Sequence, residues 1–98
     1  MDVEFSDRQQ LAFIETDRAH ETRLPISVIK SCRQKLVVIR AAPDERTLRS
    51  WKSLHYEKLE GRGDQRSIRL NDQWRLVFTL DTVCQPPKIT VLGIVDYH

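Results

Sequence analysis

The amino-acid sequence predicts an α+β fold in which two N-terminal helices pack on one face of a small, mainly antiparallel β-sheet. Apolar residues in the first half of the chain recur at helical spacing, whereas those in the second half alternate at every second position. Helices that precede a group of strands are typical of α+β proteins. The chain has 98 residues, which is enough for one modest core, so we expect a single domain over residues 1–98.

The composition favours a soluble, cytoplasmic protein that does not bind membranes. Charged residues make up 31% of the chain, the net charge is +2, and there is neither a long apolar run nor a signal peptide. The two cysteines, Cys32 and Cys84, belong to no CxxC motif or Cys/His cluster. We therefore expect free thiols rather than a disulfide, with no metal site and no cofactor.

The first elements expected along the chain are a strand and two helices. Met1 to Phe5 has the pattern of a short strand, and Ser6-Asp7-Arg8-Gln9 has the S-x-x-Q form of a capping box. The short helix that this box opens carries Leu11 and Ile14. A second helix is predicted to begin at Leu24-Pro25, because proline suits the first helical turn.

The second helix is predicted to bury one face and to end at Ala41-Ala42-Pro43. Its apolar residues follow the 3, 4, 3 spacing of a buried stripe: Ile29, Cys32, Leu36 and Ile39. We expect a further short helix from Asp44 to Trp51. A polar connection with two glycines then runs from Ser53 to Gly63.

Three strands are predicted after this connection. The first two cover Ser67–Leu70 and Trp74–Leu80, and the hairpin loop Asn71-Asp72-Gln73 joins them. Their alternation places six apolar residues on one face: Ile68, Leu70, Trp74, Leu76, Phe78 and Leu80. After Pro86-Pro87, the segment Lys88 to Val95 is apolar at almost every position, which predicts a strand covered on both faces.

The hairpin register follows from keeping the apolar residues on one side of the sheet. It sets Arg69 directly opposite Arg75 on the other face. Like charges in such a pair are unfavourable unless something neutralises them. Two adjacent guanidiniums form a bidentate clamp that matches phosphate. The alternatives are that Asp72 or Asp96 neutralises them, or that both side chains reach solvent.

Positive charge is concentrated in the middle of the chain. Residues 49 to 75 contain four acidic side chains and seven basic ones: Arg49, Lys52, Lys58, Arg62, Arg66, Arg69 and Arg75. Such a patch suits a phosphate ligand, although a solvated surface is the alternative. The candidate RNA- or phosphate-binding residues are Arg69, Arg66, Lys58 and Arg62.

The final residues, Asp96-Tyr97-His98, are polar groups that the last strand does not need for packing. Alternation places Asp96 and His98 on the same face as Thr90 and Leu92, with Tyr97 on the opposite face. Histidine exchanges protons near neutral pH, and a second one, His55, lies in the basic connection. Two histidines, a phenol and several cations are the groups that metal-independent RNA cleavage needs.

Three parts of the sequence resemble the HigB toxins of the RelE/ParE superfamily. They are Leu59-Glu60-Gly61, the run from Ser67 to Phe78, and the ending Val95-Asp96-Tyr97-His98. The family pattern reads approximately as leucine, a charged residue and glycine, then S-I-R-x-N-x-x-W-R, and finally V-D-Y-H. The resemblance is strong over residues 55 to 98 and weak over the helical half.

This resemblance implies a bacterial type II toxin with a RelE-like, microbial-RNase-like fold. Such a toxin is a ribosome-dependent mRNA endonuclease that cuts in the A site, and a HigA-like helix-turn-helix antitoxin neutralises it. Its partners are then this antitoxin, the ribosome and mRNA, with operator DNA reached only through the antitoxin. The alternatives are a ParE-like DNA gyrase poison and a degenerate member that only binds antitoxin or operator.

The resemblance also assigns roles to residues. Asp96, Tyr97 and His98 match the terminal catalytic cluster, Arg75 matches the arginine that faces the phosphate, and Arg69 matches the basic residue of S-I-R. The chain departs from the pattern in the connection, where Glu57 occupies the position of a catalytic histidine and His55 lies two residues earlier. Glu60 likewise replaces a lysine, for which Lys58 is a nearby substitute. The candidate catalytic residues are His98, Tyr97, Asp96, Arg75 and His55.

Overall fold

The computed structural model describes residues 1–6 and 8–96, with side chains described for 1–6 and 11–96. Asp7, Tyr97 and His98 therefore lie outside the described residues. Within them, five strands form one sheet: β1 (Asp2–Phe5), β2 (Glu57–Lys58), β3 (Gln65–Arg69), β4 (Trp74–Asp81) and β5 (Lys88–Asp96). The helical elements are η1 (Arg8–Glu15), η2 (Ala19–Thr22), α1 (Ile26–Ala41), α2 (Glu45–Ser50) and η3 (Lys52–Leu54), of which the three η elements are 3-10 helices.

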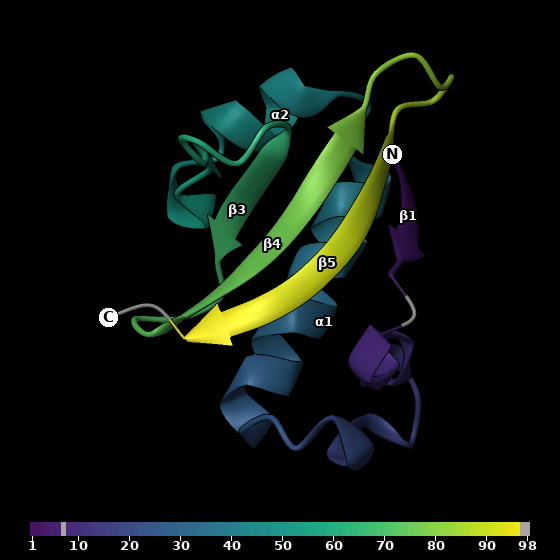
Figure 1. Ribbon diagram of the computed structural model, residues 1–98, viewed down its shortest axis with the longest axis vertical. Helices are drawn as coiled ribbons and strands as arrows, with labels where there is room; N and C mark the ends of the chain where they lie inside the picture. The colour runs from purple at the N-terminus through teal and green to yellow at the C-terminus, as the bar shows by residue number, and fades with distance from the viewer. Residues whose placement is uncertain (7, 97–98) are drawn as a thin grey trace.

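The sheet is mainly antiparallel, as predicted. Its strand order is β1-β5-β4-β3-β2, and β1 alone pairs in parallel, beside β5. The long helix α1 lies behind the sheet in Figure 1 and crosses β4 and β5. The α+β class predicted from the sequence is therefore confirmed, with the helical layer against one face of the sheet.

The core lies between α1 and the sheet. The four α1 residues predicted from the 3, 4, 3 spacing are all buried, together with Val28. On the sheet, five of the six predicted inward residues are buried, and Trp74 is half-buried against the same core. Helical and strand periodicity thus identified both sides of the core.

The prediction of two N-terminal helices is matched only in part, because the first helical segment, Arg8–Glu15, is the 3-10 helix η1 and only the second is a long α-helix. Among the side chains described in this segment, those of residues 11–15, Leu11 and Ile14 are the buried ones, and residues three apart lie in one row on a 3-10 helix. Arg33 of α1 donates hydrogen bonds to the carbonyls of Ile14 (2.6 Å) and Thr16 (2.7 Å), which holds η1 against α1. The fold has one long α-helix, and the capping box stays a prediction since it includes residue 7.

The bounds of α1 and α2 agree with the sequence. α1 begins at Ile26, directly after Pro25, and ends at Ala41. The Asp44 side chain accepts a hydrogen bond from the Thr47 backbone (3.0 Å) and caps α2, inside the predicted segment. The polar connection over 53–63 contains β2, a strand that was not predicted and whose two residues pair with β3.

Two predictions about the last strand, the face on which Asp96 lies and the burial of both faces, are wrong. Because β5 has an extra residue, Leu92, between the positions paired with Val77 and Phe78, its alternation reverses there. Asp96 therefore pairs with Trp74 and does not share a face with Thr90. Leu92 and Val95 are exposed, so this strand is not covered on both faces.

In the part of the chain that the structure describes, no helix is long and apolar enough to cross a membrane.

Candidate functional site

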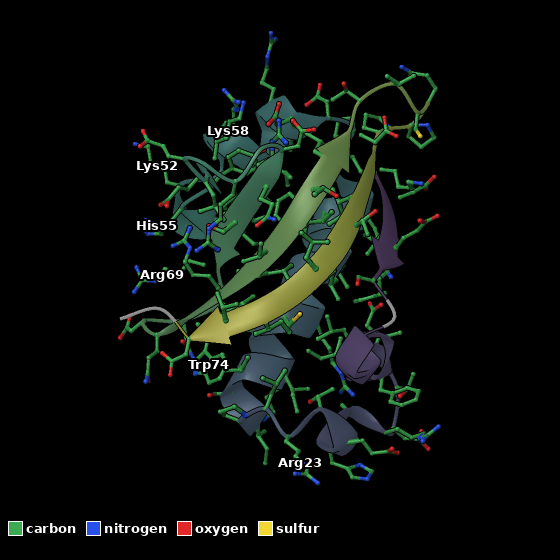
Figure 2. All side chains as sticks on the ribbon, in the orientation of Figure 1. Arg23, Lys52, His55, Lys58, Arg69 and Trp74 are labelled. Atoms are coloured by element: carbon green, nitrogen blue, oxygen red, sulfur yellow. The ribbon has the colours of Figure 1, made fainter. Side chains whose placement is uncertain are left out.

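A cleft of about 280 Å³ opens where the β3–β4 hairpin turns. The end of β3, the hairpin loop, the start of β4 and the residue after η3 line it: His55, Arg69, Asn71, Asp72, Gln73 and Arg75. In Figure 2, His55 and Arg69 lie next to each other on the same side of the sheet. Three of the predicted site residues, His55, Arg69 and Arg75, are thus brought together.

Arg75 is the more buried of the two arginines that line this cleft. Its side chain is 12% exposed. Its Nε donates a hydrogen bond to the hydroxyl of Ser67 (2.9 Å), and its Nη2 donates to the His55 carbonyl (2.5 Å). A Glu57 carboxylate oxygen lies 4.0 Å from Nη2. These contacts hold the guanidinium in place at the cleft.

Arg69 lies directly opposite Arg75 in the sheet, as the register analysis predicted. Its Nη1 is 3.4 Å from His55 Nε2, and its Nε donates a hydrogen bond to the Asn71 carbonyl (3.2 Å). Arg69 also forms an ion pair with Asp72. Of the arrangements considered from the sequence, neutralisation by Asp72 is therefore present for Arg69. This acid is 97% exposed, so a phosphate could displace it at little cost.

His55 adopts a left-handed backbone conformation, with φ of 47° and ψ of 50°. Side chains other than glycine rarely adopt positive φ, and such strain is common at functional sites. The backbone N–H of His55 donates to the Lys52 carbonyl (3.1 Å) and closes η3. This turn directs the His55 carbonyl to Arg75 and leaves the imidazole beside Arg69.

The other predicted phosphate-binding residues lie outside the cleft. Arg66 is on the helix-covered side of β3, where it donates a hydrogen bond to Glu45 (3.0 Å) and its side chain is 12% exposed. Lys58 and Arg62 line a separate cleft of about 480 Å³ beside β2. A phosphate role for these three residues stays a prediction.

The predicted C-terminal cluster is described only at Asp96. This residue ends β5 and pairs with Trp74, so the register places it on the face of the sheet opposite Arg69 and Arg75. Tyr97 and His98 lie outside the described residues, so their proposed roles stay predictions.

Sequence reasoning missed three polar residues of the site. Ser67 is buried and orients Arg75, and the same alternation that places Arg69 on this face also places Ser67 there. Asn71 accepts hydrogen bonds from the backbone N–H groups of Gln73 and Trp74 (both 2.9 Å), which fixes the hairpin loop. Gln73 is exposed at the cleft, and its position could have been found only from the folded loop.

The chemistry of the cleft suits an anionic ligand. Two guanidiniums and an imidazole converge on it, with amide side chains at its rim. Among the residues that the structure describes, no group of three His, Cys, Asp or Glu side chains could hold a metal ion. The fold and the cleft therefore define a small α+β protein with a cationic site at one end of its sheet.

Comparison with protein families identifies the chain more closely. The family model of HigB-like toxins, described as RelE-like toxins of the type II toxin-antitoxin system HigB, matches residues 3–98. The chain belongs to this family, and the resemblance seen in its sequence is confirmed. It is a type II toxin, and its family implies an antitoxin partner. A comparison with curated proteins finds no match.

Proposed function

We propose that this toxin is a ribosome-dependent mRNA endonuclease that cuts mRNA in the ribosomal A site and thereby inhibits translation. The observation that carries the proposal is the convergence of Arg69, Arg75 and His55 on one cleft. These groups supply a phosphate site and a proton-exchanging side chain within the same few ångströms. Membership of the HigB-like toxins supports the same activity.

The proposed reaction is metal-independent transesterification of RNA. A general base takes the proton from the 2′-OH, the 2′ oxygen attacks phosphorus, and the bond from phosphorus to the 5′ oxygen breaks. A general acid protonates this 5′ oxygen, so the products carry a 2′,3′-cyclic phosphate and a 5′-OH. His98 and His55 are the proposed proton-exchanging residues, and Asp96 is a further member of the proposed catalytic cluster.

The arginines have the electrostatic role in this proposal. Arg75 and Arg69 contact the scissile phosphate and stabilise the negative charge that builds up as phosphorus becomes five-coordinate. Because Arg75 is already held by Ser67 and the His55 carbonyl, little reorganisation is needed when the substrate binds. Tyr97 would orient a splayed base by stacking.

We propose that the ribosome aligns the substrate, because so small a site cannot do this alone. The cleft is shallow and exposed, whereas in-line attack requires the 2′ oxygen, phosphorus and the 5′ oxygen to be aligned. We propose that the ribosome orients the mRNA in its A site and so provides much of this alignment. We propose that a HigA-like helix-turn-helix antitoxin neutralises the toxin, and that operator DNA is reached only through this antitoxin.

Primer extension on cellular mRNA after toxin induction tests the proposal. We expect growth arrest together with new 5′ ends at codon positions, and we expect His98→Gln to abolish both while the protein remains folded. Growth arrest without new 5′ ends would instead indicate a gyrase poison. Full toxicity of a variant that lacks both Tyr97 and His98 would contradict the proposed chemistry.

A further inference from the structure

A cluster of three side chains lies on the opposite side of the sheet from the cleft. The Glu45 carboxylate of α2 accepts hydrogen bonds from the Tyr56 hydroxyl and from Arg66 Nε (3.0 Å). The Glu45 and Arg66 side chains are 22% and 12% exposed, so water competes little for these bonds. We call Glu45, Tyr56 and Arg66 the anchor cluster.

The protonation states of the anchor cluster favour these hydrogen bonds at neutral pH. Burial, followed by the hydrogen bond to Glu45, raises the pKa of the Tyr56 phenol, so its proton is retained. Burial works against ionisation of Glu45, but the hydrogen bonds from Tyr56 and Arg66 outweigh it and lower the pKa of this carboxyl. A protonated phenol therefore donates to an ionised carboxylate, which is among the stronger protein hydrogen bonds.

The anchor cluster is joined to the cleft at two places in the chain. Tyr56 directly follows His55, and Arg66 directly precedes Ser67, which orients Arg75. Successive residues of a strand point to opposite faces, so β3 directs Arg66 into the anchor cluster and Ser67 toward the cleft. In each of the two pairs, His55–Tyr56 and Arg66–Ser67, one residue therefore belongs to the cleft and its neighbour belongs to the anchor cluster.

His55 is held between two anchored residues. Leu54 before it is 1% exposed, and the ring of Tyr56 after it packs 6.2 Å from the ring of Phe78. The His55 backbone has the positive φ that an unrestrained chain would leave for a more favourable conformation. Something must therefore hold the residues on both sides of His55 in place.

We propose that the anchor cluster is a positioning device that holds His55 in its left-handed conformation and thereby sets the place of its imidazole and its carbonyl. As a claim about catalysis, this inference rests on the proposed endonuclease activity. Its structural part, the control of His55 geometry by Tyr56 and Glu45, is independent of that activity. Tyr56 and Glu45 are thus positioning residues that act on the cleft through His55.

The experiment combines NMR of the His55 imidazole with cleavage kinetics on programmed ribosomes. Tyr56→Phe removes only the hydroxyl that reaches Glu45 and keeps the ring against Phe78. We expect the His55 signal, assigned by its loss in His55→Gly, to shift or broaden. We expect kcat to fall roughly 10-fold with KM unchanged, because geometry and not binding is altered.

Two further variants make the result specific. Glu45→Gln weakens the hydrogen bond from Tyr56 and also the one from Arg66, so the double variant with Tyr56→Phe should lose little more than Glu45→Gln alone. Arg40→Gln is the matched control, because it breaks the ion pair between Arg40 and Glu15 that joins α1 to η1. This control should leave the His55 signal and the cleavage rate unchanged.

The possible outcomes separate the two proposals. An unchanged His55 signal and unchanged kcat in Tyr56→Phe and Glu45→Gln would overturn the positioning role. A shifted His55 signal in a protein whose unmodified form cleaves no mRNA would support the positioning role and refute the endonuclease. If Tyr56→Phe does not fold, the His55 signal and the kcat of Glu45→Gln test the positioning role in its place.

Discussion

His55 contributes two different groups to the cleft, and they respond differently to substitution. Its carbonyl accepts from Arg75, whereas its imidazole lies beside Arg69. Any residue can supply the carbonyl if the backbone keeps its positive φ, but only histidine supplies the ring. Glycine is therefore the substitution that removes the imidazole with the least disturbance to the turn.

We predict that His55→Gly lowers mRNA cleavage roughly 10²- to 10⁴-fold, as expected for the loss of a general acid or base. We predict that His55→Ala loses as much cleavage activity as His55→Gly. Its free energy of unfolding should be about 1 kcal/mol lower than that of His55→Gly, because alanine retains the strain of the positive φ. Urea denaturation of both variants measures this difference. Equal stability of the two would show that the turn is not strained in solution.

Asp72 forms an ion pair with the Arg69 guanidinium, to which the proposed phosphate would bind. We predict that Asp72→Asn tightens binding of a non-cleavable RNA oligonucleotide roughly 2- to 5-fold, because an exposed ion pair is worth little and its removal frees the guanidinium. Fluorescence anisotropy at fixed ionic strength measures this change. Asp17→Asn makes the same charge change outside the cleft and should have a smaller effect. Weaker binding by Asp72→Asn would instead mean that Asp72 orients Arg69 for its ligand.

Among the elements, α2 is connected to β3 through Glu45, and this connection depends on pH. The folded-state pKa of Glu45 is lowered, so its contribution to stability is present above its unfolded value of 4.5 and is lost as pH falls through the lower folded value. We predict that Glu45→Gln reduces stability by about 1 kcal/mol at pH 7 and that this difference shrinks toward pH 3. Urea denaturation across this range, with the exposed Glu60→Gln as control, measures it. A difference independent of pH would contradict ionisation of Glu45 as its source.

The elements also differ in how well the sequence predicts them. α1 and the β3–β4 hairpin were predictable because each has a periodic apolar face, and that periodicity sets Arg69 opposite Arg75. β2 was not predictable, since two residues are too few to show alternation. The reversal of β5 at Leu92 was hidden for another reason, because a bulge depends on how the neighbouring strand pairs.

The residues of the candidate site also differ in how well the sequence predicts their positions. Arg75 and Arg69 follow from local strand periodicity, whereas the place of His55 depends on η3 and on a backbone conformation that sequence patterns do not reveal. Arg66 appeared equivalent to the other arginines in the sequence. Its burial against Glu45 is a contact between residues 21 positions apart, which only the folded chain creates.

At the scale of the whole molecule, the two cysteines differ in burial. Cys32 lies in the core, and Cys84 lies near the surface. Burial raises the pKa of the Cys32 thiol to about 12, from an ordinary value of 9.0. Its contribution to stability is therefore present below pH 9.0 and is lost as pH rises toward that higher value. Cys84 lies near the surface, where a hydrogen bond to Asp81 raises its pKa and slows its reaction without shielding it.

We predict that a thiol reagent at pH 8 modifies Cys84 in the folded toxin and reaches Cys32 only when the protein unfolds. Mass spectrometry after timed labelling distinguishes one modified thiol from two. The labelling rate of Cys32 should rise with urea in parallel with global unfolding. Rapid labelling of Cys32 without denaturant would contradict the packed core between α1 and the sheet.

The molecule combines a core that stabilises the fold with a cationic cleft at one end of its sheet. We propose that Arg75 of this cleft faces the scissile phosphate of an mRNA on the ribosome. The most direct test is the single-turnover rate of mRNA cleavage on purified, programmed ribosomes by the unmodified toxin and by Arg75→Gln, with the exposed Arg46→Gln of α2 as control. We predict cleavage by the unmodified toxin and the control, and a roughly 10²-fold slower rate for Arg75→Gln in a folded protein. An unmodified toxin that cleaves nothing, or an Arg75→Gln variant that cleaves at the same rate, would refute this role of Arg75.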